Sequence, residues 1–272
     1  MVFGGGGVTG VGWTIGVLAG LAAAGVPVDR ADVVVGTSAG SVVGAQLTSG
    51  LPLDELYERQ LRPATSEIPA KLGLGILLRY ALSGIGGDDR TARARLGRLA
   101  LRAKTVPESE RREVIASRLP RSEWPSHTRL VITAVDAESG EAMAWDRDSG
   151  IGLIDAVAAS CAVPLVWPPV TINGRRYVDG GVRSPVNADY ATGCSRVLVF
   201  APITVAIRPS GRVNRQLASL GPGVRSAVFS PDAEARRAMG RNALDPAHRA
   251  PAAKAGRRQA DRIADAVRRE WA

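Results

Sequence analysis

The sequence predicts an α/β protein, a three-layer α/β/α sandwich with a mainly parallel central sheet. A short apolar start, residues 1–3, precedes a glycine run and a helix-like stretch at residues 13–21. A second apolar run, residues 32–35, then leads into a small-residue helix start at residues 41–44. Strands that alternate with helices are typical of parallel sheets covered by helices. With 272 residues, 45% of them hydrophobic, and 31 glycines, the chain can bury one sizeable core.

The first motif is a glycine run that continues to Gly10 in the spacing Gly5-x-Gly7-x-x-Gly10. Such a loop exposes several backbone N–H groups at the carboxyl edge of a parallel sheet, beside the end of the next strand. The same spacing occurs in dinucleotide-binding loops, which require an acidic residue at the end of the second strand. Here that strand ends in Gly36-Thr37-Ser38. A dinucleotide-binding oxidoreductase is therefore the least favoured hypothesis.

The second motif is Gly36-Thr37-Ser38-Ala39-Gly40, which lies between the second apolar run and the next helix start. This arrangement is typical of a nucleophile elbow, a sharp turn in which the flanking glycines remove Cβ atoms that would clash. The turn exposes the Ser38 hydroxyl above a helix N-terminus. The partial positive charge of that helix end, together with the Ala39 amide, favours the negative charge of an acyl oxyanion.

The third motif is Tyr177-Val178-Asp179-Gly180-Gly181, which follows a hairpin predicted over residues 170–177 with the turn Asn173-Gly174. Taken alone, an aspartate followed by two glycines is typical of a simple turn. The order Ser38, Asp179, His248 is also that of α/β-hydrolase triads. Those enzymes place several strands before the elbow, whereas this chain has one strand and one helix there. His248 itself lies in a Pro-Ala segment typical of a surface linker.

In this order, the three motifs resemble the signatures of the patatin-like phospholipase family: a G-x-G-x-x-G loop, a G-x-S-x-G serine and a D-G-G or D-G-A aspartate. The resemblance covers roughly residues 1–200, and three ordered motifs are far more specific than any one of them. It implies a patatin-like fold and a hydrolase of lipid carboxylic esters, of phospholipase A, lysophospholipase or lipid esterase type. Ser38 would be the nucleophile and Asp179 the proton acceptor, without a histidine. Thr9 departs from the family pattern, since many members have Arg or Lys there.

The resemblance also implies an oxyanion hole made of backbone amides, and we expect these from Gly5, Gly6, Gly7 and Ala39. The glycines of the motifs would shape the surrounding loops; they are Gly10, Gly36, Gly40, Gly180 and Gly181. An ordinary aspartate, with a pKa of about 3.9, is a weak base at neutral pH, so we expect an apolar site that raises the pKa of Asp179. No cofactor is expected. With two histidines and two cysteines, the sequence contains no usual metal-ligand spacing.

Along the chain we expect a catalytic domain at residues 1–205, with a helical insertion at about residues 51–125, and a basic C-terminal extension at residues 206–272. The insertion carries the apolar run 72–78, which fits either a helical excursion packed on the core or a lid and acyl-chain wall beside the serine. The extension ends in an amphipathic helix with basic side chains on its other faces. That helix either docks on the core or lies on an anionic membrane.

The formal net charge of +9 fits peripheral contact with an anionic membrane. It also fits nonspecific attraction to nucleic acid, but no recognition module occurs, so no specific nucleic-acid partner is expected. The start of the chain does not resemble a secretory leader, and no apolar stretch is long enough to span a bilayer. A cytoplasmic protein is therefore expected. The alternative to a lipid hydrolase is a catalytically weak lipid- or membrane-binding protein of the same fold.

Overall fold

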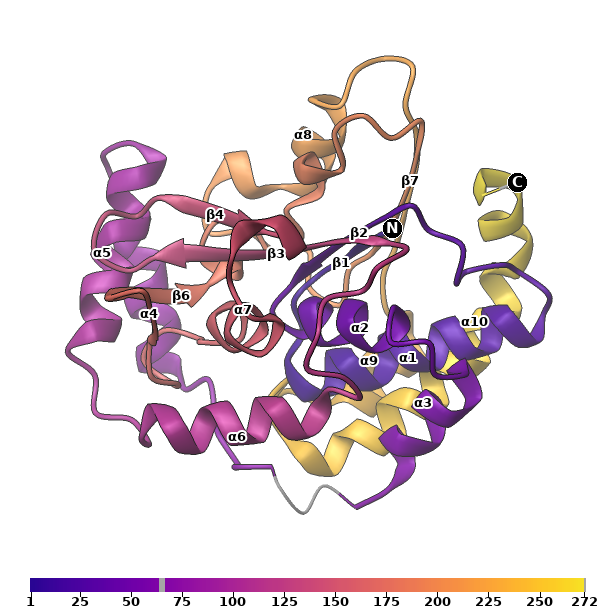
Figure 1. The fold of residues 1–272 in the computed structure, drawn as a ribbon, viewed down its shortest axis with the longest axis horizontal. Helices are drawn as coiled ribbons and strands as arrows, with labels where there is room; N and C mark the ends of the chain where they lie inside the picture. The colour runs from indigo at the N-terminus through magenta and orange to yellow at the C-terminus, as the bar shows by residue number, and fades with distance from the viewer. Residues whose placement is uncertain (64–66, 272) are drawn as a thin grey trace.

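The computed structural model describes residues 1–63 and 67–271, which fold around one mixed sheet (Figure 1). Strands β3, β2, β1, β7 and β8 lie side by side in that order and are parallel, whereas β4 and β6 run antiparallel to β3. This arrangement confirms the α/β fold class. The strands are β1 Val2–Phe3, β2 Val33–Thr37, β3 Arg129–Asp136, β4 Ala142–Trp145, β5 Val170–Ile172, β6 Arg175–Asp179, β7 Arg196–Phe200 and β8 Arg225–Phe229.

Helices cover both faces of the sheet, because successive side chains of a strand point to opposite faces. Phe3 and Val34 pack with α1, α2, α7 and α10, whereas Val2 and Val35 pack against the segment that contains α8. The helices are α1 Gly7–Ala23, α2 Ala39–Leu47, α3 Leu53–Leu61, α4 Leu74–Ser83, α5 Asp89–Leu101, α6 Glu108–Arg118, α7 Leu153–Ser160, α8 Val213–Ala218, α9 Ala233–Met239 and α10 Arg249–Trp271.

Helices α1 and α10 pack backbone against backbone (Figure 1). A Cβ atom added at Gly16 would lie 2.0 Å from the carbonyl oxygen of Ala253, and one added at Gly256 would lie 2.2 Å from that of Trp13. Only hydrogen atoms fit between the two backbones at these positions. The apolar face of α10 is buried in this contact. Of the two alternatives for the C-terminal helix, the structure has the one in which it docks on the core.

The described residues of the range 51–125 form helices α3 to α6, and α4 exposes large apolar side chains. On α4, Leu74 is 84% exposed and Leu78 is 58% exposed. The segment after β7 lies beside α4, since Arg208 Nη1 donates to the Gly84 carbonyl oxygen at 2.7 Å. In that segment Val205 is 83% exposed. Across the described part of the chain, no helix has both the length and the apolar character required to cross a bilayer.

Candidate active site

Ser38 joins β2 to α2 through a strained turn. Its φ of +53° and ψ of −119° lie in a region that L-residues rarely adopt and that costs about 1–3 kcal/mol. The flanking glycines are required by close packing. A Cβ atom at Gly40 would lie 1.9 Å from the Phe3 carbonyl oxygen, and one at Gly36 would lie 2.6 Å from Ser41 Cα. Strand β2 therefore passes into α2 through the sharp turn that the motif predicts.

The sheet brings Asp179 to Ser38. On one edge of β3, Thr37 of β2 is paired with Thr133, and Asp179 of β6 is paired with the next residue, Ala134. Because β2 runs parallel to β3 and β6 runs antiparallel to it, the two strands end at neighbouring positions of this edge, while β4 occupies the other edge. The side chains of Ser38 and Asp179 meet there in a hydrogen bond.

The environment of Asp179 raises the pKa of its carboxyl group. The residue is 4% exposed, and burial raises the pKa of Asp179 to about 7. Hydrogen bonds from Ser38 and from the Gly181 amide, whose nitrogen lies 2.7 Å from Oδ1, oppose this rise. Burial is the larger effect. Burial therefore raises the pKa of Asp179, the direction expected from the sequence.

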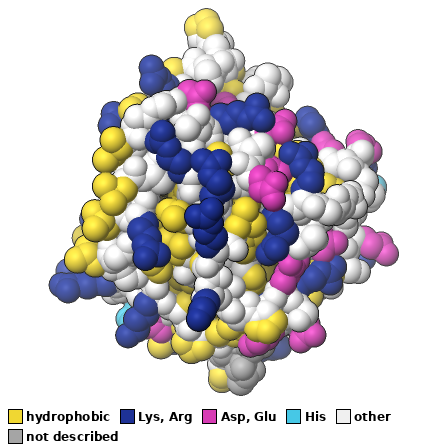
Figure 2. Space-filling view, turned by 90° about the vertical axis from the view of Figure 1, so that its left-hand side faces the viewer, with side chains coloured by type: hydrophobic (Ala, Val, Ile, Leu, Met, Phe, Trp, Pro, Cys, Tyr) yellow, Lys and Arg dark blue, Asp and Glu magenta, His cyan; other side chains and the backbone are white. Residues whose placement is uncertain are grey.

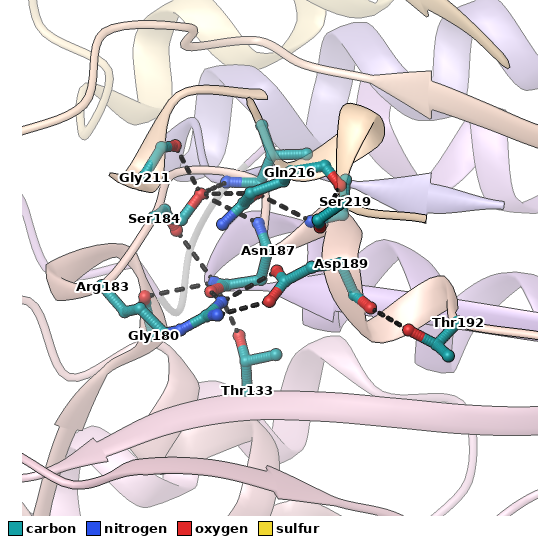
Figure 3. Close-up of polar contacts among 12 residues, drawn as sticks. Thr133, Gly180, Arg183, Ser184, Asn187, Asp189, Thr192, Gly211, Gln216 and Ser219 are labelled. Carbon is teal, nitrogen blue, oxygen red and sulfur yellow. Dashed lines mark hydrogen bonds and ion pairs between the residues drawn. The ribbon is translucent and has the colours of Figure 1, made fainter. Parts of the chain in front are cut away.

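Asn187 lies among Thr133, Gly180 and Arg183, and its side-chain amide hydrogen-bonds to all three (Figure 3). Its Nδ2 lies 3.0 Å from Thr37 Oγ1 and 3.2 Å from the carbonyl oxygen of Gly180. Arg183 Nη1 donates to Asn187 Oδ1 at 2.6 Å and also binds Asp189, so the amide is held in one orientation. Asn187 thus joins the residue before Ser38 to the residue after Asp179. Nothing in the local sequence around Asn187 distinguishes it from an ordinary loop asparagine.

Two helix N-termini meet beside Ser38. Gly7 is the first residue of α1 and Ala39 is the first residue of α2, so neither N–H group has an acceptor within its own helix. Both residues line one pocket together with Ser38. Gly7 has a φ of +59°, and a Cβ atom there would lie 2.3 Å from the Ala243 carbonyl oxygen, so only glycine fits. Gly6, the N-cap residue of α1, completes this glycine turn.

The prediction for Gly5 needs correction. Its N–H group donates to the Pro185 carbonyl oxygen at 2.7 Å, so it is engaged within the fold and is not free for an oxyanion. Sequence alone could not show this, because the acceptor lies 180 residues further along the chain. Thr9, which replaces the common Arg or Lys, is buried, and its Oγ1 lies 3.5 Å from the Gly6 carbonyl oxygen. Thr9 therefore supports the turn but supplies no charge.

The pocket beside Ser38 is small, with a cavity volume of about 20 Å³. Its walls include the apolar side chains of Val8, Val163 and Leu244, and also Arg111 of α6 and Trp167. Sequence analysis did not identify Arg111. His248, by contrast, does not line this pocket; its Nδ1 lies 3.2 Å from Asp245 Oδ2 on the surface. The Ser-acid-His alternative therefore lacks its histidine.

Comparison with known proteins identifies a family model and several solved chains that are similar to this chain. The family model described as patatin-like phospholipase matches residues 1–192. The crystal structure of VipD from Legionella pneumophila is similar at a TM-score of 0.48 and 13% sequence identity, over 97% of this chain and 66% of that one. The chain thus spans slightly less than two thirds of the length of VipD in that structure. A search of curated proteins gave no match.

Proposed function

The chain belongs to the patatin-like phospholipase family, and from this membership we propose that it hydrolyses carboxylic esters of lipids with Ser38 as nucleophile and Asp179 as proton acceptor. The observation that carries the proposal is the hydrogen bond between the Ser38 side chain and a buried carboxyl group whose pKa is raised to about 7. Near this pKa the carboxylate is populated at neutral pH and is basic enough to accept a proton.

In the proposed reaction, Ser38 Oγ attacks the ester carbonyl carbon while Asp179 takes the hydroxyl proton. The negative oxygen of the tetrahedral intermediate accepts hydrogen bonds from the amides of Gly6, Gly7 and Ala39, each worth about 3 kcal/mol. When the intermediate collapses, the ester C–O bond breaks, and the alcohol or lysolipid leaves with the proton from Asp179. Water then attacks the acyl-serine, again giving a proton to Asp179. The fatty acid is released and Ser38 recovers its proton.

Labelling of the serine tests this function directly. We expect the purified protein to hydrolyse p-nitrophenyl butyrate equally well with and without EDTA, since no metal or cofactor is required. A fluorophosphonate should bind one site per chain, located at Ser38 by mass spectrometry, and turnover should fall in proportion to labelling. A folded protein that neither turns over the ester nor takes up the label would contradict the hydrolase. Binding of lipid vesicles by that protein would then support the catalytically weak lipid-binding alternative.

We assign contact with the lipid surface to α4 and residues 203–207 rather than to the C-terminal helix, whose apolar face is buried. Figure 2, which faces the side where α4 and α5 lie, shows hydrophobic side chains interspersed with basic ones. Such a mixture suits an anionic membrane surface. Tyr80 of α4 donates to the Pro164 carbonyl oxygen at 2.9 Å, which links this surface to the segment before Trp167. A cytoplasmic location stays a prediction.

The double variant Leu74→Ser, Leu78→Ser tests this contact. We expect hydrolysis of anionic phospholipid vesicles to fall by about tenfold or more, since partial burial of each leucine in lipid contributes about 1 kcal/mol. Hydrolysis of dissolved p-nitrophenyl butyrate should stay the same, because both side chains are exposed and neither supports the core. The ratio of the two rates is the measurement. An equal change in both rates would rule out a role specific to the lipid surface.

A further inference from the structure

Arg111 is a buried cation that the ester chemistry leaves unexplained. It is 5% exposed, and its Nε and Nη1 groups have no hydrogen-bond acceptor among the described residues. The indole Nε1 of Trp167 also lacks an acceptor in this part of the structure. Buried donors almost always have partners, and an unmet charged donor is more costly than a neutral one. These unmet donors therefore indicate a missing acceptor.

The surroundings of Arg111 are positively charged. Arg118 Nε donates to Glu67 Oε1 at 2.9 Å, and Arg249 Nη1 lies 3.9 Å from the same carboxylate oxygen. One carboxylate thus faces two other guanidinium groups and does not hydrogen-bond Arg111. Burial and the charge of Arg118 lower the pKa of Arg111 to about 10, so it stays charged at neutral pH. The missing acceptor is therefore an anion.

The geometry also places these donors at the reacting serine. Arg111, Trp167 and Ser38 line the same pocket. The guanidinium carbon of Arg111 lies 3.9 Å from the centre of the Trp167 ring, a cation–π contact that fixes the guanidinium group while its Nε and Nη1 groups stay without a hydrogen-bond partner among the described residues. A guanidinium group matches two oxygens of a phosphate at once. In a glycerophospholipid, the phosphate is only a few bonds from an acyl ester.

We propose that Arg111, together with the indole N–H of Trp167, binds the phosphate of a phospholipid or lysophospholipid while its acyl ester lies at Ser38. The inference rests on the proposed function and deepens it, since Arg111 would determine the preference for phosphate-bearing esters over neutral esters. Arg111 is a binding residue here, and Ser38 and Asp179 carry the bond-breaking steps. Substitution of Arg111 should therefore lower the rate on a phosphate-bearing ester more than the rate on a neutral ester.

The experiment compares kcat/KM on three dissolved substrates: dihexanoyl phosphatidylcholine, dihexanoylglycerol and p-nitrophenyl butyrate. Arg111→Met should lower kcat/KM for the phospholipid by about 10- to 100-fold more than for the other two substrates, the range of one or two hydrogen bonds to a charged group. Arg111→Lys should restore part of the loss. The matched control is Arg112→Met on the same helix, where the side chain is 45% exposed and binds Asp155 at 2.7 Å. That control should leave the substrate ratio unchanged.

Thermal unfolding separates a binding role from a structural one. Removing an unpaired buried charge should leave the midpoint of Arg111→Met equal to or above that of wild type, whereas loss of a structural ion pair would lower it. A lower unfolding midpoint for Arg111→Met, together with an unchanged ratio of kcat/KM between the phospholipid and the neutral esters, would overturn the proposal. An equal loss of kcat/KM on all three substrates would overturn it as well. A third result would also overturn the proposal: inorganic phosphate inhibits turnover of p-nitrophenyl butyrate, but the enzyme shows no preference for the phospholipid. That result would indicate a site for free phosphate.

A failure of the hydrolase proposal gives a different result. The wild type would then not hydrolyse p-nitrophenyl butyrate at all. Binding of a non-hydrolysable diether phosphatidylcholine, measured by calorimetry on Ser38→Ala, still tests the subsite in that event. If the double variant Ser38→Ala, Arg111→Met binds this lipid at least about tenfold more weakly than Ser38→Ala, the phosphate subsite is supported. Equal binding by the two variants rejects it.

Discussion

Asp179→Asn is expected to lower kcat for ester hydrolysis by about a hundred- to ten-thousandfold, the usual contribution of a positioned general base. Asparagine keeps the size of the side chain, and its oxygen can still accept the N–H of Gly181, which lies 2.7 Å from Oδ1. It cannot take the proton of Ser38. The rate on saturating p-nitrophenyl butyrate, compared with Ser38→Ala, is the measurement. A variant that retains more than a tenth of wild-type turnover would exclude Asp179 as the base.

The same carboxyl group predicts the pH profile of the wild type. Only the ionised form accepts a proton, and burial raises the pKa of Asp179 to about 7. We therefore expect kcat/KM to rise with pH and to level off above an apparent pKa of about 7. An apparent pKa of about 4, close to that of an exposed aspartate, would show that burial does not set the pKa of the reacting group.

Stability should change in the opposite sense to activity. Because the pKa of Asp179 is higher in the folded protein, about 7, than its ordinary value of 3.8, folding favours the protonated form. Its contribution to stability is complete below the unfolded value and is lost as pH rises through the folded value. At pH 8, Asp179→Asn should thus be more stable than wild type by a few kcal/mol, since one pKa unit is about 1.4 kcal/mol. Urea unfolding at pH 8 and pH 4 measures this, and the difference should vanish at pH 4.

Gly40→Ala is expected to destabilise the fold by at least about 3 kcal/mol, the upper range for overpacking. The added Cβ would lie 1.9 Å from the carbonyl oxygen and 2.4 Å from the carbonyl carbon of Phe3. These are backbone atoms of β1, which is paired on both sides within the sheet. No side-chain rotation can relieve the contact, so α2 must move away, and the turn at Ser38 moves with it. Urea unfolding and ester turnover should therefore both show large losses.

Gly75→Ala is the matched control for Gly40→Ala. Gly75 lies in α4, and an added Cβ would meet no heavy atom within 4 Å. The same chemical change should there leave turnover of p-nitrophenyl butyrate unaltered and raise stability by up to about 1 kcal/mol, through the higher helix propensity of alanine. Equal stability of the two variants would contradict the close approach of β1 and α2.

The sequence predicts those parts of the fold and of the site that depend on short stretches of neighbouring residues. The Asn173-Gly174 turn has φ values of +50° and +76°, and it forms the predicted hairpin that delivers Asp179. Strand β8 was not predicted, because its residues are only partly buried and show no apolar alternation. The amphipathic pattern of α10 predicts a helix that either docks on the core or lies on a membrane, but it does not identify the partner surface. Its partner surface is a row of glycines on α1, a composition that by itself lowers helix propensity.

The unpredicted site residues act through contacts between distant segments. Asn187 binds Thr37 across 150 residues of sequence, and Arg111 of α6 contacts Trp167 in the segment between α7 and β5. Asn187 lies in a loop, and Arg111 lies in an arginine-rich helix. Residues of these types in such segments are common on protein surfaces. Their roles follow from burial, which depends on the packing of the whole chain.

The contact of α1 with α10 has a consequence for protein synthesis. The turn that carries Gly7 is held by residues near α10, since the Thr9 N–H donates to the Ala243 carbonyl oxygen at 3.2 Å. A ribosome therefore translates almost all of the described sequence before the first glycine turn gains its support. A nascent chain that already contains Ser38 and Asp179 still lacks this support until Ala243 has been added. We expect ester hydrolysis to begin only after α10 has left the exit tunnel and has packed on α1.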